Sequence, residues 1–124
     1  MAEALTRHFY PDSVKAGSAG LSPLGLITEE TLRVLAESGI ATNGLRSKGL
    51  TDLDLSEFHL LVNLTHHSLE AEVPRIFQGK VIHRPVIDPF GKALLVYREA
   101  RDNIRRFVVE DLPRYLGEGL RPKY

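Results

Sequence analysis

Asp88 is the residue whose position most strongly suggests chemistry. In the sequence VIDPFG (86–91) it follows an apolar, strand-like run and precedes Pro89. A carboxylate at the carboxyl end of a strand in an α/β protein lies where such folds bind ligands, so Asp88 is a candidate for a functional site. An aspartate before proline is also common at the start of a helix, where it caps the first turn. The residues alone favour the helix cap, and both interpretations stay open.

The other candidate ligands are histidines around the strand-like run at 59–65. His59 begins this run, and His66 and His67 follow it directly. Adjacent residues seldom point at one ion, and no carboxylate or thiol joins them at ligand spacing, so a loop or packing role is favoured and no metal is expected. The basic loop LRSKGL at 45–50 could contact an anionic substrate, although a solvated turn is the favoured interpretation.

The composition restricts the possible functions. The 124 residues carry 16 basic and 16 acidic side chains, 43% hydrophobic residues and no cysteine. We expect one domain at 1–117 followed by a tail at 118–124, with neither a nucleic-acid nor a membrane partner. The opening MAEALTRHFY is charged and amphipathic, unlike a secretory signal, so a cytoplasmic location is expected. Without cysteine, these residues form no disulfide, thiolate metal site or thiol nucleophile.

Amphipathic spacing predicts the main helices. Met1, Leu5 and Phe9 recur on one helical face. Thr28 is a suitable N-cap for a helix that ends near Ser38 and is followed by glycine. A long helix is predicted over 92–112, with an apolar stripe opposite a charged face that we expect to be a salt-bridged surface. The stripe comprises Leu95, Val96, Ala100, Ile104, Phe107, Val108 and Leu112, and the charged face comprises Arg98, Glu99, Arg101, Asp102, Arg105, Arg106 and Glu110.

The remaining segments include candidate strands. Residues 59–65 and 80–87 are apolar runs without clean alternation, as expected for parallel strands covered on both faces, and residues 14–18 are a third candidate. Residues 51–58 are expected to form a short helical turn, and a further short helix should end before Pro74. Helices and strands thus alternate as α, β, α, β, α, β, α. This order predicts a small three-layer α/β domain in which a short parallel sheet is flanked by helices.

Several short motifs occur in a characteristic order: MAEAL, AGSAGLSP, the helix end ESGI, the loop LRSKGL, the strand HLLVNLT, and VIDPFG before the last helix. In this order and spacing they resemble the low-molecular-weight protein tyrosine phosphatase family, which includes related arsenate reductases. The resemblance covers nearly the whole chain. It implies hydrolysis of phosphomonoesters through a cysteine nucleophile, no cofactor, and a phosphorylated protein or a small phosphate ester as substrate.

The resemblance also gives roles to particular residues. Asp88 matches the family's general acid, which protonates the leaving oxygen, and this becomes the favoured interpretation of that residue. Phe90 lies where the family often carries aromatic residues that line the substrate pocket, although a buried anchor under the last helix is an equally good interpretation. Gly91 interrupts the aromatic pair that is frequent there, so the resemblance does not predict a preference for aryl phosphates.

In the family, a first strand and a phosphate-binding loop of the form Cys, five residues, Arg precede the MAEAL helix. Neither occurs in these 124 residues, so we expect the chain as given to be inactive. The family's first strand lies between the segments that correspond to 14–18 and 59–65. Unpaired buried amides would each cost roughly 1–3 kcal/mol, so we expect the two segments to pair directly or a second chain to fill the gap. A homodimer is favoured, with the apolar face at Met1, Leu5 and Phe9 left unburied and available for association.

Two other functions remain as alternatives. The chain could be a non-catalytic homologue that acts as an interaction or oligomerisation module, since it has no cysteine. An unrelated flavodoxin-like binding domain is disfavoured, because no phosphate or flavin loop precedes any predicted helix. Within the resembling family, arsenate reduction by a relay of cysteines is disfavoured, because residues 66–87 contain none.

Overall fold

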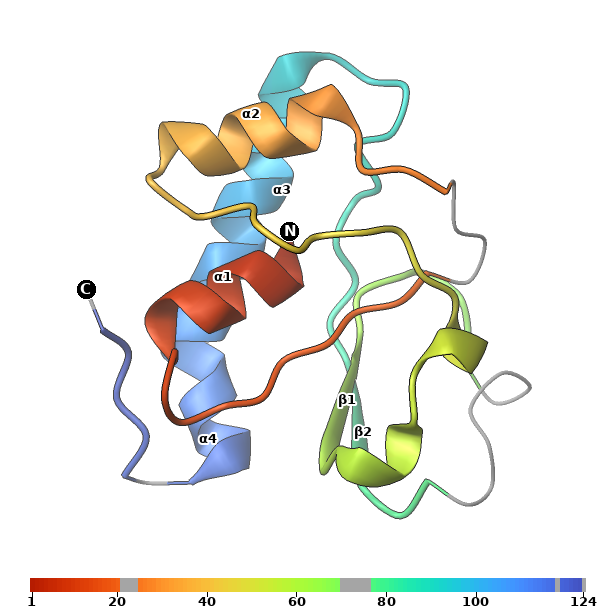
Figure 1. The fold of residues 1–124 in the computed structure, drawn as a ribbon, viewed down its shortest axis with the longest axis vertical. Helices are drawn as coiled ribbons and strands as arrows, with labels where there is room; N and C mark the ends of the chain where they lie inside the picture. Colours follow the sequence, from red (N-terminus) through yellow and green to blue (C-terminus); the bar gives the residue numbers. More distant parts are fainter. Residues whose placement is uncertain (21–24, 70–76, 118, 124) are drawn as a thin grey trace.

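The computed structural model describes residues 1–20, 25–69, 77–117 and 119–123, and Figure 1 shows its helices beside a short parallel sheet. This arrangement confirms the predicted α/β class. In chain order the elements are α1 (Ala2–Phe9), α2 (Glu29–Glu37), the 3₁₀ turns η1 (Leu50–Asp52) and η2 (Leu55–Glu57), β1 (Leu60–Asn63), β2 (Lys80–His83), α3 (Leu94–Arg106), the π-helical turn η3 (Phe107–Asp111) and α4 (Leu112–Leu116).

Helix α1 lies at the centre of the hydrophobic core. Leu5 and Phe9 are 0% and 3% exposed, and they belong to one buried cluster with Phe107 and Val108 of η3. The hydroxyl of Tyr10, which follows α1, donates to the C=O of Val108 at 2.7 Å. The predicted helix and its apolar face are therefore confirmed. The expectation that this face stays unburied is wrong, because the C-terminal helical segment covers it.

Helix α2 begins and ends where its sequence predicts. The Thr28 hydroxyl oxygen accepts the N–H of Thr31 at 3.3 Å, which satisfies one of the donors that every helix leaves unpaired at its start. After the helix, Gly39 has φ +70°, and the N–H of Ile40 donates to the C=O of Leu35 at 3.0 Å. This is the left-handed glycine termination, in which the apolar residue after the glycine is buried against the helix.

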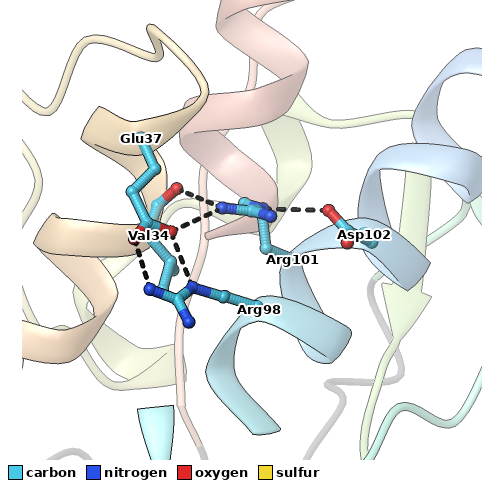
Figure 2. Close-up of polar contacts among 5 residues, drawn as sticks. All are labelled: Val34, Glu37, Arg98, Arg101 and Asp102. Atoms are coloured by element: carbon cyan, nitrogen blue, oxygen red, sulfur yellow. Dashed lines mark hydrogen bonds and ion pairs between the residues drawn. The ribbon is translucent and has the colours of Figure 1, made fainter. Parts of the chain in front are cut away.

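A cluster of ion pairs connects α2 with α3 (Figure 2). The Glu37 carboxylate accepts from Arg98 Nε at 3.0 Å and Nη2 at 2.7 Å, and from Arg101 Nη1 at 3.0 Å. Arg101 also donates to the C=O of Val34 at 2.9 Å and to Asp102 at 2.9 Å. The hydrogen bonds from Arg98 are the main cause that lowers the pKa of Glu37 to about 2. The predicted salt-bridged face of the last helix is confirmed at Arg98 and Arg101, and its principal partner lies on α2.

The predicted long helix at 92–112 forms with two differences. It begins at Leu94, and its C-terminal part is the π-helical turn η3 followed by α4. Leu95 is 61% exposed, so its place in the apolar stripe is wrong, whereas Tyr97, which the stripe omits, is buried at 3%. The stripe residues that are buried as predicted are Ala100, Ile104, Phe107, Val108 and Leu112.

Strands β1 and β2 form a parallel pair in which Leu60 lies opposite Lys80 and Asn63 opposite His83. The two predicted strands and their parallel direction are thus confirmed, over shorter spans than predicted. The expectation that both strands are covered on both faces is wrong for β2. Val81 is 37% exposed, and in this strand only Ile82 is partly buried.

The predicted strand at 14–18 does not form. Residues 15–19 have no regular secondary structure, and the segment makes an isolated parallel bridge only at its end, between Gly20 and Gly49. The physical reason is that a strand is held by its ladder of hydrogen bonds to a neighbour, and the described residues offer none beside this segment. Direct pairing of 14–18 with 59–65 was therefore a wrong expectation.

The remaining local expectations have mixed outcomes. The helical turn at 51–58 is confirmed as η1 and η2, and the short helix expected before Pro74 lies outside the described residues.

Within 118–124, the N–H of Lys123 donates to the C=O of Phe9 at 2.7 Å, and Lys123 Nζ lies 2.6 Å from Asp12 Oδ2. The division into a domain at 1–117 and a tail at 118–124 stays a prediction.

Candidate active site

Asp88 lies beyond the carboxyl end of the sheet. After β2, the N–H of Arg84 donates to the C=O of Asn63 at 2.9 Å, and the N–H of Val86 donates to the C=O of Leu64 at 2.8 Å. These two bonds hold the chain along the end of β1 and bring Asp88 to that edge two residues later. Because ligands of open α/β sheets bind outside the carboxyl ends of the strands, the position suits a functional carboxylate.

The local structure excludes one of the two interpretations of Asp88 that rest on its sequence. Helix α3 begins at Leu94 with Ala93 as its N-cap, so the helix-cap interpretation is wrong. The side chain instead stabilises a tight turn, in which Asp88 Oδ1 accepts the N–H of Phe90 at 3.0 Å. The turn continues through Gly91, whose φ of +76° disfavours any residue with a side chain. The carboxylate is exposed to solvent.

Phe90 is 56% exposed. The interpretation of this ring as a buried anchor under the last helix is therefore wrong, because a core residue would be almost completely covered. An exposed aromatic ring two residues after an exposed carboxylate is instead available to a bound molecule. The backbone hydrogen bond between Phe90 and Asp88 keeps the two residues in one turn.

Asn63 organises the carboxyl end of β1. Its side chain is 3% exposed, and its Oδ1 accepts from the N–H of Thr65 at 2.9 Å and from the Thr65 hydroxyl at 2.7 Å. Its Nδ2 donates to the C=O of His67 at 2.7 Å and lies 3.1 Å from Nδ1 of His83. The sequence reasoning missed Asn63. The available signal was an amide residue at the end of an apolar run with threonine two positions later, a pattern in which the side chain bonds to the backbone.

The histidines do not converge on a common point. The side chains of His59, His66 and His67 are exposed, and His59 and His67 take part in the fold through their backbone C=O groups. Over the described ranges, no group of three or more histidine, cysteine or carboxylate residues is placed to hold a metal ion.

The basic loop at 45–50 contributes to a buried ionic cluster. Glu3 of α1 is 2% exposed, and its Oε1 accepts from Lys48 Nζ at 3.1 Å and from the Ser18 hydroxyl at 3.0 Å. Its Oε2 lies 2.8 Å from Arg7 Nη1, an ion pair whose angles are not those of a hydrogen bond. The interpretation of this loop as a solvated turn is wrong at Lys48, whose side chain is 10% exposed. The sequence reasoning missed Glu3, because nothing local marks it as buried.

The chain is thus a small α/β domain with a short parallel sheet. An exposed carboxylate lies in the turn beyond the carboxyl edge of that sheet. A profile of the family described as low molecular weight phosphotyrosine protein phosphatase matches residues 1–112. The chain therefore belongs to this family. In the described residues, no helix combines the length and apolar character needed to cross a membrane.

Solved structures have the same fold. A variant of the YwlE arginine phosphatase with a phosphorylated active-site serine is 28% identical, with 86% of this chain and 80% of that chain covered and a TM-score of 0.73. An arsenate reductase from Archaeoglobus fulgidus is 26% identical, with 88% of each chain covered and a TM-score of 0.67. The tyrosine phosphatase Wzb from Escherichia coli K30 is 22% identical, with 86% and 82% covered and a TM-score of 0.74. A search of curated proteins found no match.

Proposed function

We propose that this chain carries the general acid of a phosphomonoester phosphatase, Asp88. In the reaction, a cysteine thiolate attacks phosphorus, the bond from phosphorus to the leaving oxygen breaks, and the Asp88 carboxyl gives its proton to that oxygen. The observation that carries the proposal is an exposed carboxylate at the carboxyl edge of the sheet, inside the span that matches the phosphatase family. Phe90 would contact the substrate from the same turn.

The nucleophile does not come from these residues, which contain no cysteine. A serine is a poor substitute here, because Ser18 already donates to Glu3, which is itself paired with Lys48 and Arg7. We therefore propose that the 124 residues alone have no phosphatase activity. The substrate is a phosphorylated protein or a small phosphate ester, and the likeness to an arginine phosphatase adds phosphoarginine to the substrates worth assaying.

The proposal is tested by supplying the nucleophile. The strand and Cys-x₅-Arg loop of a solved family member are fused ahead of Met1, and hydrolysis is measured with a phosphotyrosine peptide, a phosphoarginine peptide and p-nitrophenyl phosphate. We expect the fusion to be active and Asp88→Asn to lower kcat by about 10²–10⁴-fold with the phosphotyrosine peptide, the range of general acid catalysis. The loss should be smaller with p-nitrophenyl phosphate, whose leaving group needs less protonation.

Asp12→Asn is the matched control, because Asp12 is an exposed aspartate whose partner is Lys123 in the tail. It should leave kcat unchanged. A fusion that is active and keeps its full rate with Asp88→Asn would refute the role of Asp88. A folded but inactive fusion would favour the second candidate function, a non-catalytic interaction or oligomerisation module.

We also propose that the chain forms a homodimer. The apolar face of α1 cannot supply the contact, because Leu5 and Phe9 are buried. Support comes from β1, which pairs with β2 on one edge and has no strand partner on its other edge among the described residues. The cytoplasmic location expected from the sequence remains a prediction.

A further inference from the structure

The amide side chain of Asn63 uses all of its hydrogen-bonding positions, although the residue is only 3% exposed. Its Oδ1 accepts from the N–H and the hydroxyl of Thr65. Its Nδ2 faces two acceptors, the C=O of His67 at 2.7 Å and Nδ1 of His83 at 3.1 Å. An asparagine amide has two donor hydrogens and two acceptor lone pairs, so this side chain is fully satisfied. A satisfied buried network of this kind specifies one arrangement of the segments that it joins.

Two backbone groups fix the direction in which this amide points. The N–H of Thr65 can only donate and the C=O of His67 can only accept, so Oδ1 must face the first group and Nδ2 the second. The atom that Asn63 presents to His83 is therefore a donor, and Nδ1 of His83 must be the unprotonated acceptor. The neutral imidazole ring of His83 consequently carries its proton on Nε2.

Three contacts join the end of β1 to residues 83–86. The first is the contact between the Asn63 amide and the His83 ring. The other two are backbone hydrogen bonds, in which the C=O groups of residues 63 and 64 accept from the N–H groups of residues 84 and 86. Asp88 follows the last of these contacts by two residues, so its location depends on how residues 83–86 are held.

The Asp88 turn has few polar attachments of its own. The N–H of Phe90 donates to Asp88 Oδ1 at 3.0 Å. The N–H of Lys92 donates to the C=O of Pro89 at 2.9 Å, and this bond also lies within the turn. Neither Asp88 nor Phe90 makes a further hydrogen bond or ion pair with the described residues. The position of the turn relative to the sheet is therefore set by the preceding residues 83–86.

We propose that Asn63, acting together with His83, is a positioning residue for the Asp88 carboxyl group. Asn63 holds the carboxyl ends of β1 and β2 together, and these ends place the Asp88 turn beyond the sheet. The catalytic meaning of this role rests on the proposed phosphatase function, in which Asp88 is the general acid. Such an acid must lie within hydrogen-bond reach of the leaving oxygen, so a displaced turn lowers the rate of a reaction that needs its proton.

The first test uses the 124-residue chain and requires no activity. Asn63→Leu removes the amide, and His83→Leu removes only the acceptor at an exposed position, so it keeps the proposal testable even where Asn63→Leu does not fold. Amide hydrogen exchange followed by NMR should be at least about tenfold faster at Val86 and Phe90 in each variant, as expected for the loss of about one hydrogen bond. Exchange at Ile40, at the end of α2, should not change, because the opening is local.

Two further measurements on the same chain sharpen this test. In mildly alkaline buffer, the ring-nitrogen chemical shifts of His83 should show a neutral ring with its proton on Nε2. His59→Leu is the matched control, because His59 is an exposed histidine at the opposite, amino end of β1. It should leave exchange at Val86 and Phe90 unchanged.

The second test uses the active fusion described above. His83→Leu should lower kcat with the phosphotyrosine peptide by about tenfold or more, and the loss should be smaller with p-nitrophenyl phosphate, whose leaving group needs less protonation. Combined with Asp88→Asn, His83→Leu should cause no further loss, because both changes remove the same proton transfer. A merely structural effect would be equal with both substrates and would add to that of Asp88→Asn. His59→Leu should leave kcat unchanged.

Several results would overturn the proposal. Unchanged exchange at Val86 and Phe90 in both variants would do so, and so would a neutral His83 ring protonated on Nδ1. In an active fusion, an equal loss with both substrates, or a loss that adds to that of Asp88→Asn, would also exclude the positioning role. An inactive fusion would count against the phosphatase function alone, because the exchange experiment still decides whether Asn63 and His83 hold the Asp88 turn.

Discussion

At the scale of single residues, the least expected feature is the buried carboxylate of Glu3. It lies in the first helix and joins three segments, because Lys48 and Ser18 come from separate loops and Arg7 from the next turn of α1. A buried ion pair adds little net stability compared with apolar residues, but removal of one partner leaves a charge without compensation. Lys48 should therefore matter far more for stability than an exposed lysine.

Lys48→Met is expected to lower the free energy of unfolding by about 3 kcal/mol, the lower end of the range for a broken buried pair, because Arg7 stays near Glu3. Lys15→Met is the matched control: Lys15 and Glu57 form an exposed pair with side chains 68% and 52% accessible, which should contribute at most about 1 kcal/mol. Urea unfolding followed by circular dichroism measures both. Equal losses in the two variants would contradict the importance of burial at Glu3.

These residues also define how far the site was predictable. The sequence marks Asp88 and Phe90 as candidate site residues because a motif of contiguous residues carries them, and their place in a site stays a prediction. The interpretations of Asp88 as a helix cap and of Phe90 as a buried anchor are wrong. Glu3 was missed because its burial depends on segments that are remote in the chain. Asn63 was missed because its burial depends on its place at the end of a strand pair. Burial of a polar residue is a tertiary property, and the sequence around it looks like any amphipathic helix or strand end.

At the scale of elements, the three-residue cluster of Glu37, Arg98 and Arg101 joins α2 to α3 through ion pairs. The pKa of Glu37 falls from an ordinary value of 4.5 to about 2 in the folded chain, chiefly because Arg98 donates hydrogen bonds to it. A carboxyl group with a lowered folded pKa stabilises the fold above its unfolded pKa. That contribution is lost as the pH falls from about 4.5 towards 2.

The free energy of unfolding of the unchanged chain should therefore decrease more steeply between pH 4.5 and pH 2 than that of Glu37→Gln. Glu99→Gln, which alters an exposed glutamate on α3, should keep the steep dependence. Thermal unfolding in buffers across this pH range, at fixed ionic strength, measures the difference. Parallel curves for Glu37→Gln and the unchanged chain would refute the linkage.

The elements that formed as predicted are those whose signals are local. The Thr28 cap, the Gly39 termination and the apolar spacing of α1 each act within one or two turns, and they were sufficient to predict these helices. The strand at 14–18 was not predictable in the same way, because strand formation requires a neighbour that the described chain does not provide there. The burial of the β2 side chains likewise depends on which helices pack against this strand.

At the scale of the whole molecule, the sheet remains the least complete layer. It has two strands in the described residues, and one edge of β1 has no strand partner among them. Exposed edges of this kind favour association with another chain. The homodimer proposed above is the form of association that needs no other protein.

Sedimentation velocity should show a dimer at micromolar concentration that dissociates on dilution. Ala41→Glu, which changes an exposed alanine outside the sheet, should not change the distribution. A chain that stays monomeric over this whole concentration range would show that no second copy covers the edge.

The hydrogen bond between Tyr10 and Val108 has a consequence for synthesis on the ribosome. It joins residues 98 positions apart, and the core around Leu5 and Phe9 is closed by the same C-terminal segment. At a translation rate of about 5–20 residues per second, α1 leaves the ribosome about 5–20 seconds before its packing partner is made. During that interval the apolar side of α1 is a target for chaperones, and the core is completed only after the last helix has emerged.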